Sequence, residues 1–178
     1  LDVSKGQPWA RWCVGGTTNI VLNCIDRHRD TPVWDQTFLV WEGENPDEQR
    51  TLSYAEFDAE TCRLAGTLKE MGVGKGDVVG IYMPNLPETF VAFFAILKIG
   101  AIVMPLFSGF GPQPLITRLQ DGGARAVITA DGTWRRGSVG AMKPVLDEAL
   151  AQVPCVEHVV VVQRLGDKLP VAMQAGRD

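Results

Sequence analysis

The sequence predicts an α/β fold, a doubly wound, mainly parallel sheet with flanking helices, preceded by an irregular segment and a β-hairpin. Strand-like and helix-like runs alternate four times along the chain. The central run, residues 76–111, has the pattern strand, short loop, apolar helix, strand and glycine-containing loop. The 178 residues, of which 46% are hydrophobic and 21% charged, suit one domain with a sizeable core.

The central run is expected to form a βαβ unit. Its first strand, Val78–Met83, is apolar and β-rich. The helix begins at Pro87, whose missing N–H costs nothing in a first turn, and Gly100 ends it. A second apolar strand, Ala101–Leu106, follows, so the two strands are expected to lie parallel. Apolar residues cover most of the helix and predict its burial: Phe90, Val91, Phe93, Phe94, Ile96, Leu97 and Ile99.

The chain before this unit predicts a lead-in, a short helix and a hairpin. Residues Trp9–Gly16 form an irregular lead-in whose tryptophans are expected to lie against the domain. Asn19 is suited to cap a short helix. Residues Thr37–Trp41 are a strand, and Arg50–Ser53 are expected to pair with it as a hairpin.

A capping box, Ser53-Tyr54-Ala55-Glu56, predicts the start of an amphipathic helix. Gly72 is placed to end this helix in a left-handed conformation. The apolar positions recur at helical spacing and form its inner face: Tyr54, Phe57, Leu64, Ala65, Leu68 and Met71.

The second half of the chain continues the alternation. The expected elements are a helix opening at Pro112 or Pro114 and ended by Gly122 and Gly123, a strand at Arg125–Ala130, a polar loop at Asp131–Gly140, a helix at Pro144–Gln152 and a strand at Val156–Val162. The unbroken valines of that last strand indicate burial on both faces.

We divide the chain into a lead-in segment with a short helix (1–36), an α/β domain (37–165) and a ragged end or truncation point (166–178). A start at Leu1 rather than methionine also indicates a processed or truncated product.

Charge and composition exclude several classes of function. A net charge of -4 argues against nucleic-acid binding. No apolar run reaches the ~18 residues of a membrane helix, and the first residues lack the pattern of a signal peptide. The cysteines fit no zinc template and are expected to be reduced and packed as small apolar residues: Cys13, Cys24, Cys62 and Cys155. A cytoplasmic protein without a metal site is therefore expected.

Familiar catalytic and cofactor motifs are incomplete. Residues Met71–Asp77 lack the first glycine and the hydroxyl of a Walker loop and precede a strand, so they are expected to be a tight turn. Neither Ser108 nor Ser138 lies in a G-x-S-x-G nucleophile motif. No G-x-G-x-x-G of a dinucleotide-binding domain follows the first strand. No residue is assigned a catalytic role.

Two loops that follow core strands are candidate binding elements. Phe107-Ser108-Gly109 and Thr133–Ser138 both lie at the carboxyl ends of strands, where open α/β sheets bind ligands. Arg135 and Arg136 add two positive charges beside Gly137, which suits phosphate oxygens. The alternative from local sequence is a solvated arginine pair in an exposed loop.

Several motifs, in order, give the chain a family resemblance. They are NIVLNCIDRH at 19–28, TLSYAEF at 51–57, IYMPNLPE at 81–88, KIGA at 98–101, LFSGFGPQPL at 106–115 and ITADGTWRRG at 128–137. From about Trp9 to Leu165 the chain resembles AMP-forming acetyl-CoA synthetases and related short-chain acyl-CoA ligases. The resemblance implies activation of a carboxylic acid with ATP and Mg²⁺ as an acyl-adenylate, followed by acyl transfer to coenzyme A.

The resemblance also implies a coenzyme A site. The family loop that matches Phe107, Ser108 and Gly109 lies against coenzyme A, and Ser108 stands where a glycine is usual. The loop that matches Arg135–Ser138 holds the 3′-phosphate with two arginines three residues apart. Arg135 matches the first arginine, Ser138 replaces the second, and Arg136 is a neighbouring source of the missing charge. Coenzyme A contact is thus implied for Phe107, Ser108, Gly109, Arg135, Arg136, Gly137 and Ser138.

The family's phosphate loop, its adenine- and ribose-binding motifs and its carboxy-terminal lid lie downstream of the matched region. The resemblance therefore implies an amino-terminal fragment that is inactive alone, binds no cofactor tightly and self-associates through its cut surface. The alternative from another class is a free-standing, non-catalytic α/β binding or interaction module.

Overall fold

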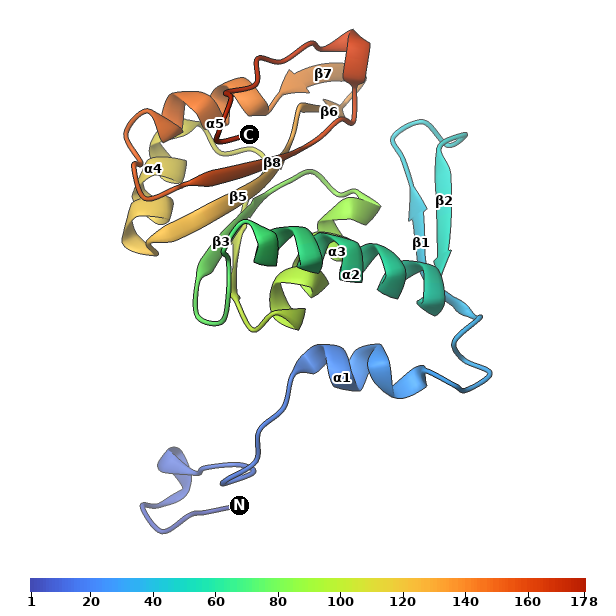
Figure 1. Ribbon diagram of the computed structural model, residues 1–178, viewed down its shortest axis with the longest axis vertical. Helices are drawn as coiled ribbons and strands as arrows, with labels where there is room; N and C mark the ends of the chain where they lie inside the picture. The colour runs from blue at the N-terminus through green and yellow to red at the C-terminus, as the bar shows by residue number, and fades with distance from the viewer.

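The computed structural model describes residues 1–178 and confirms the α/β fold (Figure 1). Four parallel strands form the main sheet in the order β4-β3-β5-β8. The strands are β1 (Thr37–Glu42), β2 (Gln49–Ser53), β3 (Val78–Tyr82), β4 (Ile102–Leu106), β5 (Ala124–Ala130), β6 (Gly132–Arg135), β7 (Ser138–Ala141) and β8 (His158–Val162). The α-helices are α1 (Ile20–Cys24), α2 (Tyr54–Glu70), α3 (Pro87–Lys98), α4 (Pro112–Asp121) and α5 (Lys143–Leu150). Short 3-10 turns cover Gln7–Trp9, Asp26–His28 and Gly166–Lys168.

The helices cover both faces of the sheet, as a doubly wound fold requires. Helices α2 and α3 pack together on one face, while α4 and α5 pack together on the other (Figure 1). The main hydrophobic core contains 28 buried residues between these layers. No helix combines the length and the apolar character needed to cross a membrane.

The predicted starts and ends of the central helices are confirmed. Ser53 Oγ accepts a hydrogen bond from the Glu56 amide, and the Glu56 carboxylate accepts one from the Ser53 amide. Gly72 has a φ of 82° and Gly100 a φ of 76°, which glycine adopts without steric cost.

The expectation that α3 is buried is confirmed for its inner side, which includes Val91 and Ile96, and is wrong for its outer side. Phe90 and Phe93 on its outer side are 42% and 37% exposed. Helix α3 packs against α2 and the sheet over only part of its circumference, so apolar composition overstated its burial.

The short amino-terminal helix is confirmed, and it docks on the domain. The Asn19 side-chain oxygen accepts a hydrogen bond from the Val21 amide at 2.9 Å. A second hydrophobic cluster holds this helix against α2 and α3: Val21, Ile25, Leu52, Phe57 and Val91. The prediction for the tryptophans is wrong, because Trp9 and Trp12 are 71% and 75% exposed. They lie in a segment that extends away from the sheet at the lower left of Figure 1.

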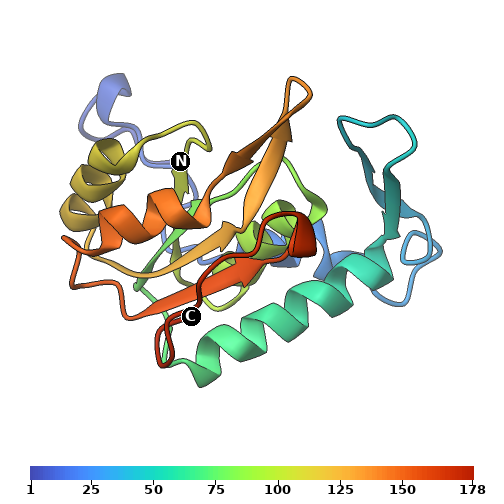
Figure 2. The same cartoon turned by 90° about the horizontal axis from the view of Figure 1, so that it is seen from above.

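The hairpin of β1 and β2 is confirmed as an antiparallel pair. The predicted polar loop at 131–140 is wrong, since β6 and β7 form a second antiparallel hairpin there. Each of its strands has only four residues, too few for an alternating pattern to stand out. Figure 2 shows both hairpins, in cyan and orange, projecting toward the same side of the molecule.

The last strand, β8, is not buried on both faces, and of its valines only Val159 is buried. The physical reason is its position at the edge of the sheet. The residues after it fold back along this edge, where the Val159 amide donates a hydrogen bond to the Arg177 carbonyl oxygen at 2.8 Å. The division of the chain at residues 36 and 165 stays a prediction.

All four cysteines are free, as expected. The expectation that they pack inside is wrong for Cys13, Cys62 and Cys155, which are exposed. Cys13 lies in the extended lead-in, Cys62 on the outer side of α2 and Cys155 in the turn before β8, so none of them faces the core.

Candidate functional site

The two candidate loops meet at the carboxyl edge of the sheet. Strand β3 lies between β4 and β5, so the segments that leave β4 and β5 flank its end. A Cβ atom added to Gly109 would lie 3.2 Å from Arg135 Nη1 and 2.6 Å from Phe107 Cε1. The structure therefore brings the predicted residues of both loops together, and it leaves no room for a side chain at residue 109.

Hydrogen bonds fix the loop that follows β4. The Phe110 amide donates to the Phe107 carbonyl oxygen at 2.9 Å. The Tyr82 hydroxyl, at the end of β3, donates to the Phe110 carbonyl oxygen at 2.9 Å. Burial raises the pKa of Tyr82, so this hydroxyl keeps its proton at neutral pH. The turn is thereby anchored to the sheet, while residue Phe107 stays 59% exposed.

The four residues implied to hold a phosphate form the tip of the second hairpin. Arg135 pairs with Ser138 across the hairpin, and the intervening Arg136 and Gly137 have φ values of 53° and 73°. Two successive left-handed residues make the tight turn that suits the twist of a hairpin. Ser138 Oγ donates to the Arg135 carbonyl oxygen at 2.9 Å, so its hydroxyl supports the turn.

A cleft of about 470 Å³ lies between this hairpin and the loop after β4. Its lining includes no acidic side chain, and neither arginine takes part in an ion pair. The residues that line it are Ser108, Thr133, Arg135, Arg136, Ser138, Gly140, Ala141 and Met142. Two unpaired guanidinium groups beside a hydroxyl can bind phosphate oxygens by charge-assisted hydrogen bonds.

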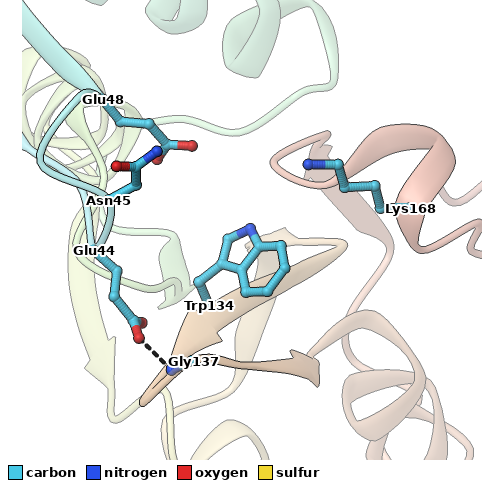
Figure 3. A pocket seen from close by; sticks show the side chains of 6 residues that line it. All are labelled: Glu44, Asn45, Glu48, Trp134, Gly137 and Lys168. Atoms are coloured by element: carbon cyan, nitrogen blue, oxygen red, sulfur yellow. Dashed lines mark hydrogen bonds between the residues drawn. The ribbon is translucent and has the colours of Figure 1, made fainter.

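The opposite face of the hairpin borders a second cavity of about 380 Å³ (Figure 3). Trp134 lines it, and the Lys168 Nζ atom is 5.7 Å from the centre of the Trp134 ring. Glu44, from the turn between β1 and β2, accepts a hydrogen bond from the Gly137 amide. Sequence reasoning missed this contact, since it joins residues 93 positions apart and no motif marks it.

The base of the hairpin is held by a buried carboxylate that sequence reasoning also missed. Asp131 is 1% exposed, and its two oxygens accept hydrogen bonds from four backbone amides at 2.7–3.1 Å. The donors are the amides of Gly132, Arg164, Leu165 and Gly166. A single side chain thus ties the start of β6 to the segment after β8.

The sequence of the chain is similar to those of known enzymes. The family model described as AMP-binding enzyme matches residues 25–176. The chain is 46% identical over 175 residues to the acetyl-coenzyme A synthetase of Methylobacterium radiotolerans, covering 97% of this chain and 26% of that protein. It is 46% identical over 178 residues to the acetyl-coenzyme A synthetase of Streptomyces coelicolor, covering 100% of this chain and 27% of that protein.

A solved structure gives the same result. Acetoacetyl-CoA synthetase from Streptomyces lividans superposes with a TM-score of 0.84 at 25% identity, covering 96% of this chain and 25% of that one. The chain thus spans about a quarter of the length of these relatives and corresponds to an amino-terminal portion of them. Because the family model covers most of its residues, the chain belongs to the AMP-binding enzyme family, as its motifs indicated.

Proposed function

We propose that this chain is the amino-terminal part of an AMP-forming ligase that joins a short-chain carboxylic acid, most simply acetate, to coenzyme A. The proposal is supported by the acetyl-coenzyme A synthetases that the whole chain matches. In that reaction the acid and ATP give an acyl-adenylate and pyrophosphate, and coenzyme A then displaces AMP. The acid, ATP and Mg²⁺ would be held mainly by residues outside this chain, in an enzyme that we place in the cytoplasm.

The part of the site that this chain supplies is one wall for coenzyme A. The observation that carries this proposal is the approach of Arg135 to Gly109, which joins two segments of different strands into one basic cleft. Arg135 and Arg136 bind the 3′-phosphate, and the Ser108 hydroxyl lines the same cleft. The exposed Phe107 ring, which lies over Gly109 beside Arg135, offers an apolar surface to the nucleotide.

The remaining expected role is structural. Strand β4 leaves one edge of the sheet unpaired, with Ile102 51% exposed and the exposed Phe93 on the neighbouring helix. We propose that the rest of the ligase covers this edge, and that the isolated chain self-associates through it.

The test of the coenzyme A wall is calorimetric titration of the 178-residue chain with coenzyme A and with 3′-dephospho-coenzyme A. We expect weaker binding of the dephosphorylated ligand. Arg135→Ala is expected to weaken coenzyme A binding by about 1.5–3 kcal/mol, the worth of a hydrogen bond to a charged group. The same substitution should leave the affinity for 3′-dephospho-coenzyme A unchanged.

Arg63→Ala is the matched control, because Arg63 is exposed on α2 and forms no ion pair. Equal binding of the two ligands by the native chain would refute the assignment of the phosphate to this cleft. No binding of either ligand would favour a non-catalytic interaction module instead. Formation of AMP from acetate, ATP and coenzyme A by the chain alone would refute its expected inactivity.

A further inference from the structure

We propose that Glu44 is a positioning residue for the coenzyme A wall. Its carboxylate holds the tip of the hairpin formed by β6 and β7, and thereby keeps Arg135 against Gly109. This inference rests on the proposed function and adds to it a residue from a separate hairpin, far away in sequence.

The hairpin needs a support at its tip because its other firm attachment lies at its base. The four amides bound by Asp131 fix Gly132 and the segment after β8. From there the hairpin projects beyond the edge of the sheet (Figure 2). An element fixed at one end can swing at the other, and a swing at residue 137 would carry Arg135 away from the loop after β4.

The turn that carries Glu44 is itself firmly built. The Gly43 amide donates to the Glu48 carbonyl oxygen at 2.7 Å, and the Glu48 amide donates to the Asn45 carbonyl oxygen at 2.9 Å. The Glu48 carboxylate is ion-paired with Arg164, whose guanidinium carbon lies 5.5 Å from the centre of the Trp41 ring. The first hairpin is therefore a fixed platform from which the Glu44 side chain reaches the Gly137 amide (Figure 3).

Glu44 acts from the face of the hairpin opposite to the ligand. Glu44 and Trp134 line the same cavity, whereas Arg135 lines the cleft together with Ser108. Alternate residues of a strand point to opposite faces, which accounts for this division between residues 134 and 135. The carboxylate can thus hold the turn without occupying the place of a phosphate.

Three variants in the turn between β1 and β2 distinguish a positioning role of Glu44 from a general effect of its negative charge. Glu44→Ala removes the acceptor, Glu44→Gln keeps an oxygen that can accept the same hydrogen bond, and Asp47→Asn removes a charge from the same turn. The Asp47 side chain forms no ion pair, and its residue is exposed, which makes Asp47→Asn the matched control. All three substitutions lie on exposed residues.

Two readouts are required, the affinity of each variant for coenzyme A and the hydrogen-exchange rate of the Gly137 amide. We expect Glu44→Ala to bind coenzyme A about tenfold more weakly, which equals about 1.4 kcal/mol, and to exchange the Gly137 amide faster. Glu44→Gln should restore most of the affinity, and Asp47→Asn should match the native chain.

Three results would overturn the inference. Native affinity in Glu44→Ala would show that the hairpin formed by β6 and β7 keeps its position without the hydrogen bond to Glu44. Tighter binding in both Glu44 variants would show that the carboxylate only repels the ligand. An equal loss in Asp47→Asn would show a general effect of charge. A native chain that binds no coenzyme A would instead refute the proposed function, and with it this role of Glu44.

Discussion

Replacing Asp131 with asparagine should destabilise the chain strongly, although the two side chains have nearly the same shape. The two side chains have the same outline, so no cavity and no clash arises. The change replaces one carboxylate oxygen with an NH₂ group, which donates hydrogen bonds and cannot accept them. In the native chain both oxygens of Asp131 only accept.

The size of the effect follows from the individual contacts. If the amide oxygen takes the place of Oδ1, it keeps the Gly132 and Arg164 amides at 2.7 Å and 2.9 Å. The Leu165 amide keeps a longer contact at 3.1 Å. The Gly166 amide, which donates to Oδ2 at 2.8 Å, loses its acceptor and faces another donor.

An unsatisfied buried donor costs about 1–3 kcal/mol, and the bonds that remain lose the strength that a charged acceptor adds. The desolvation cost of the native carboxylate, which asparagine avoids, offsets part of this loss. We therefore expect Asp131→Asn to lower the free energy of unfolding by about 2–4 kcal/mol. That is a large share of the total stability of a domain.

Urea unfolding followed by tryptophan fluorescence and by circular dichroism measures this loss. Asp167→Asn is the control, because Asp167 is exposed nearby and forms no ion pair. A loss below about 1 kcal/mol in Asp131→Asn, or an equal loss in the control, would contradict the argument that the amide contacts of Asp131 stabilise the fold.

The remaining predictions concern the carboxyl end and the aromatic cluster. Burial alone would raise the pKa of Asp178, but hydrogen bonds from Arg177 and Lys143 outweigh it and lower the pKa from 3.8 to about 2. Because the folded pKa lies below the unfolded one, this stabilisation is present above about pH 4 and is lost as the pH falls toward 2. Urea unfolding at several pH values should therefore show the advantage of the native chain over Asp178→Asn shrinking across this range, whereas a constant advantage would refute the assignment. Phe57→Ala should cost about 3–5 kcal/mol, since the ring is fully buried. The Phe57 ring centre lies 4.4 Å from that of Phe38, so the substitution also removes a contact between aromatic rings. Phe90→Ala should lower the free energy of unfolding far less in the same assay, because Phe90 is partly exposed.

The elements that sequence predicted well are those that local residues determine. The capping box at Ser53 and Glu56 needs only four consecutive residues, and it forms as expected. Gly72 and Gly100 end their helices through their own backbone freedom. The central βαβ unit likewise follows from adjacent runs of apolar residues, and its strands pair as predicted.

The elements that sequence missed depend on position in the fold. The valines of β8 would suit a central strand, but strand order places them at an edge, and no local pattern encodes that order. The hairpin at 132–141 turns through Arg136 in a left-handed conformation, where asparagine or aspartate before glycine would have signalled the turn. Asp131 accepts hydrogen bonds from amides more than 30 residues away, and Glu44 accepts one from an amide more than 90 residues away, so no local pattern reveals either contact.

The spacing between strands of the sheet explains why the proposed coenzyme A wall needs the hairpin formed by β6 and β7. Neighbouring strands lie about 4.8 Å apart, so β4 and β5, with β3 between them, are separated by about 10 Å. In this structure the gap between the loop after β4 and the end of β5 is bridged by a side chain, that of Arg135. Because β6 continues past the end of β5, it carries Arg135 far enough for its side chain to reach Gly109. The reach that creates the cleft also takes the arginine away from the packed core. Its position then depends on polar contacts at the two ends of the hairpin, and substitutions at Asp131 and Glu44 should separate the stability of the fold from the affinity of the site.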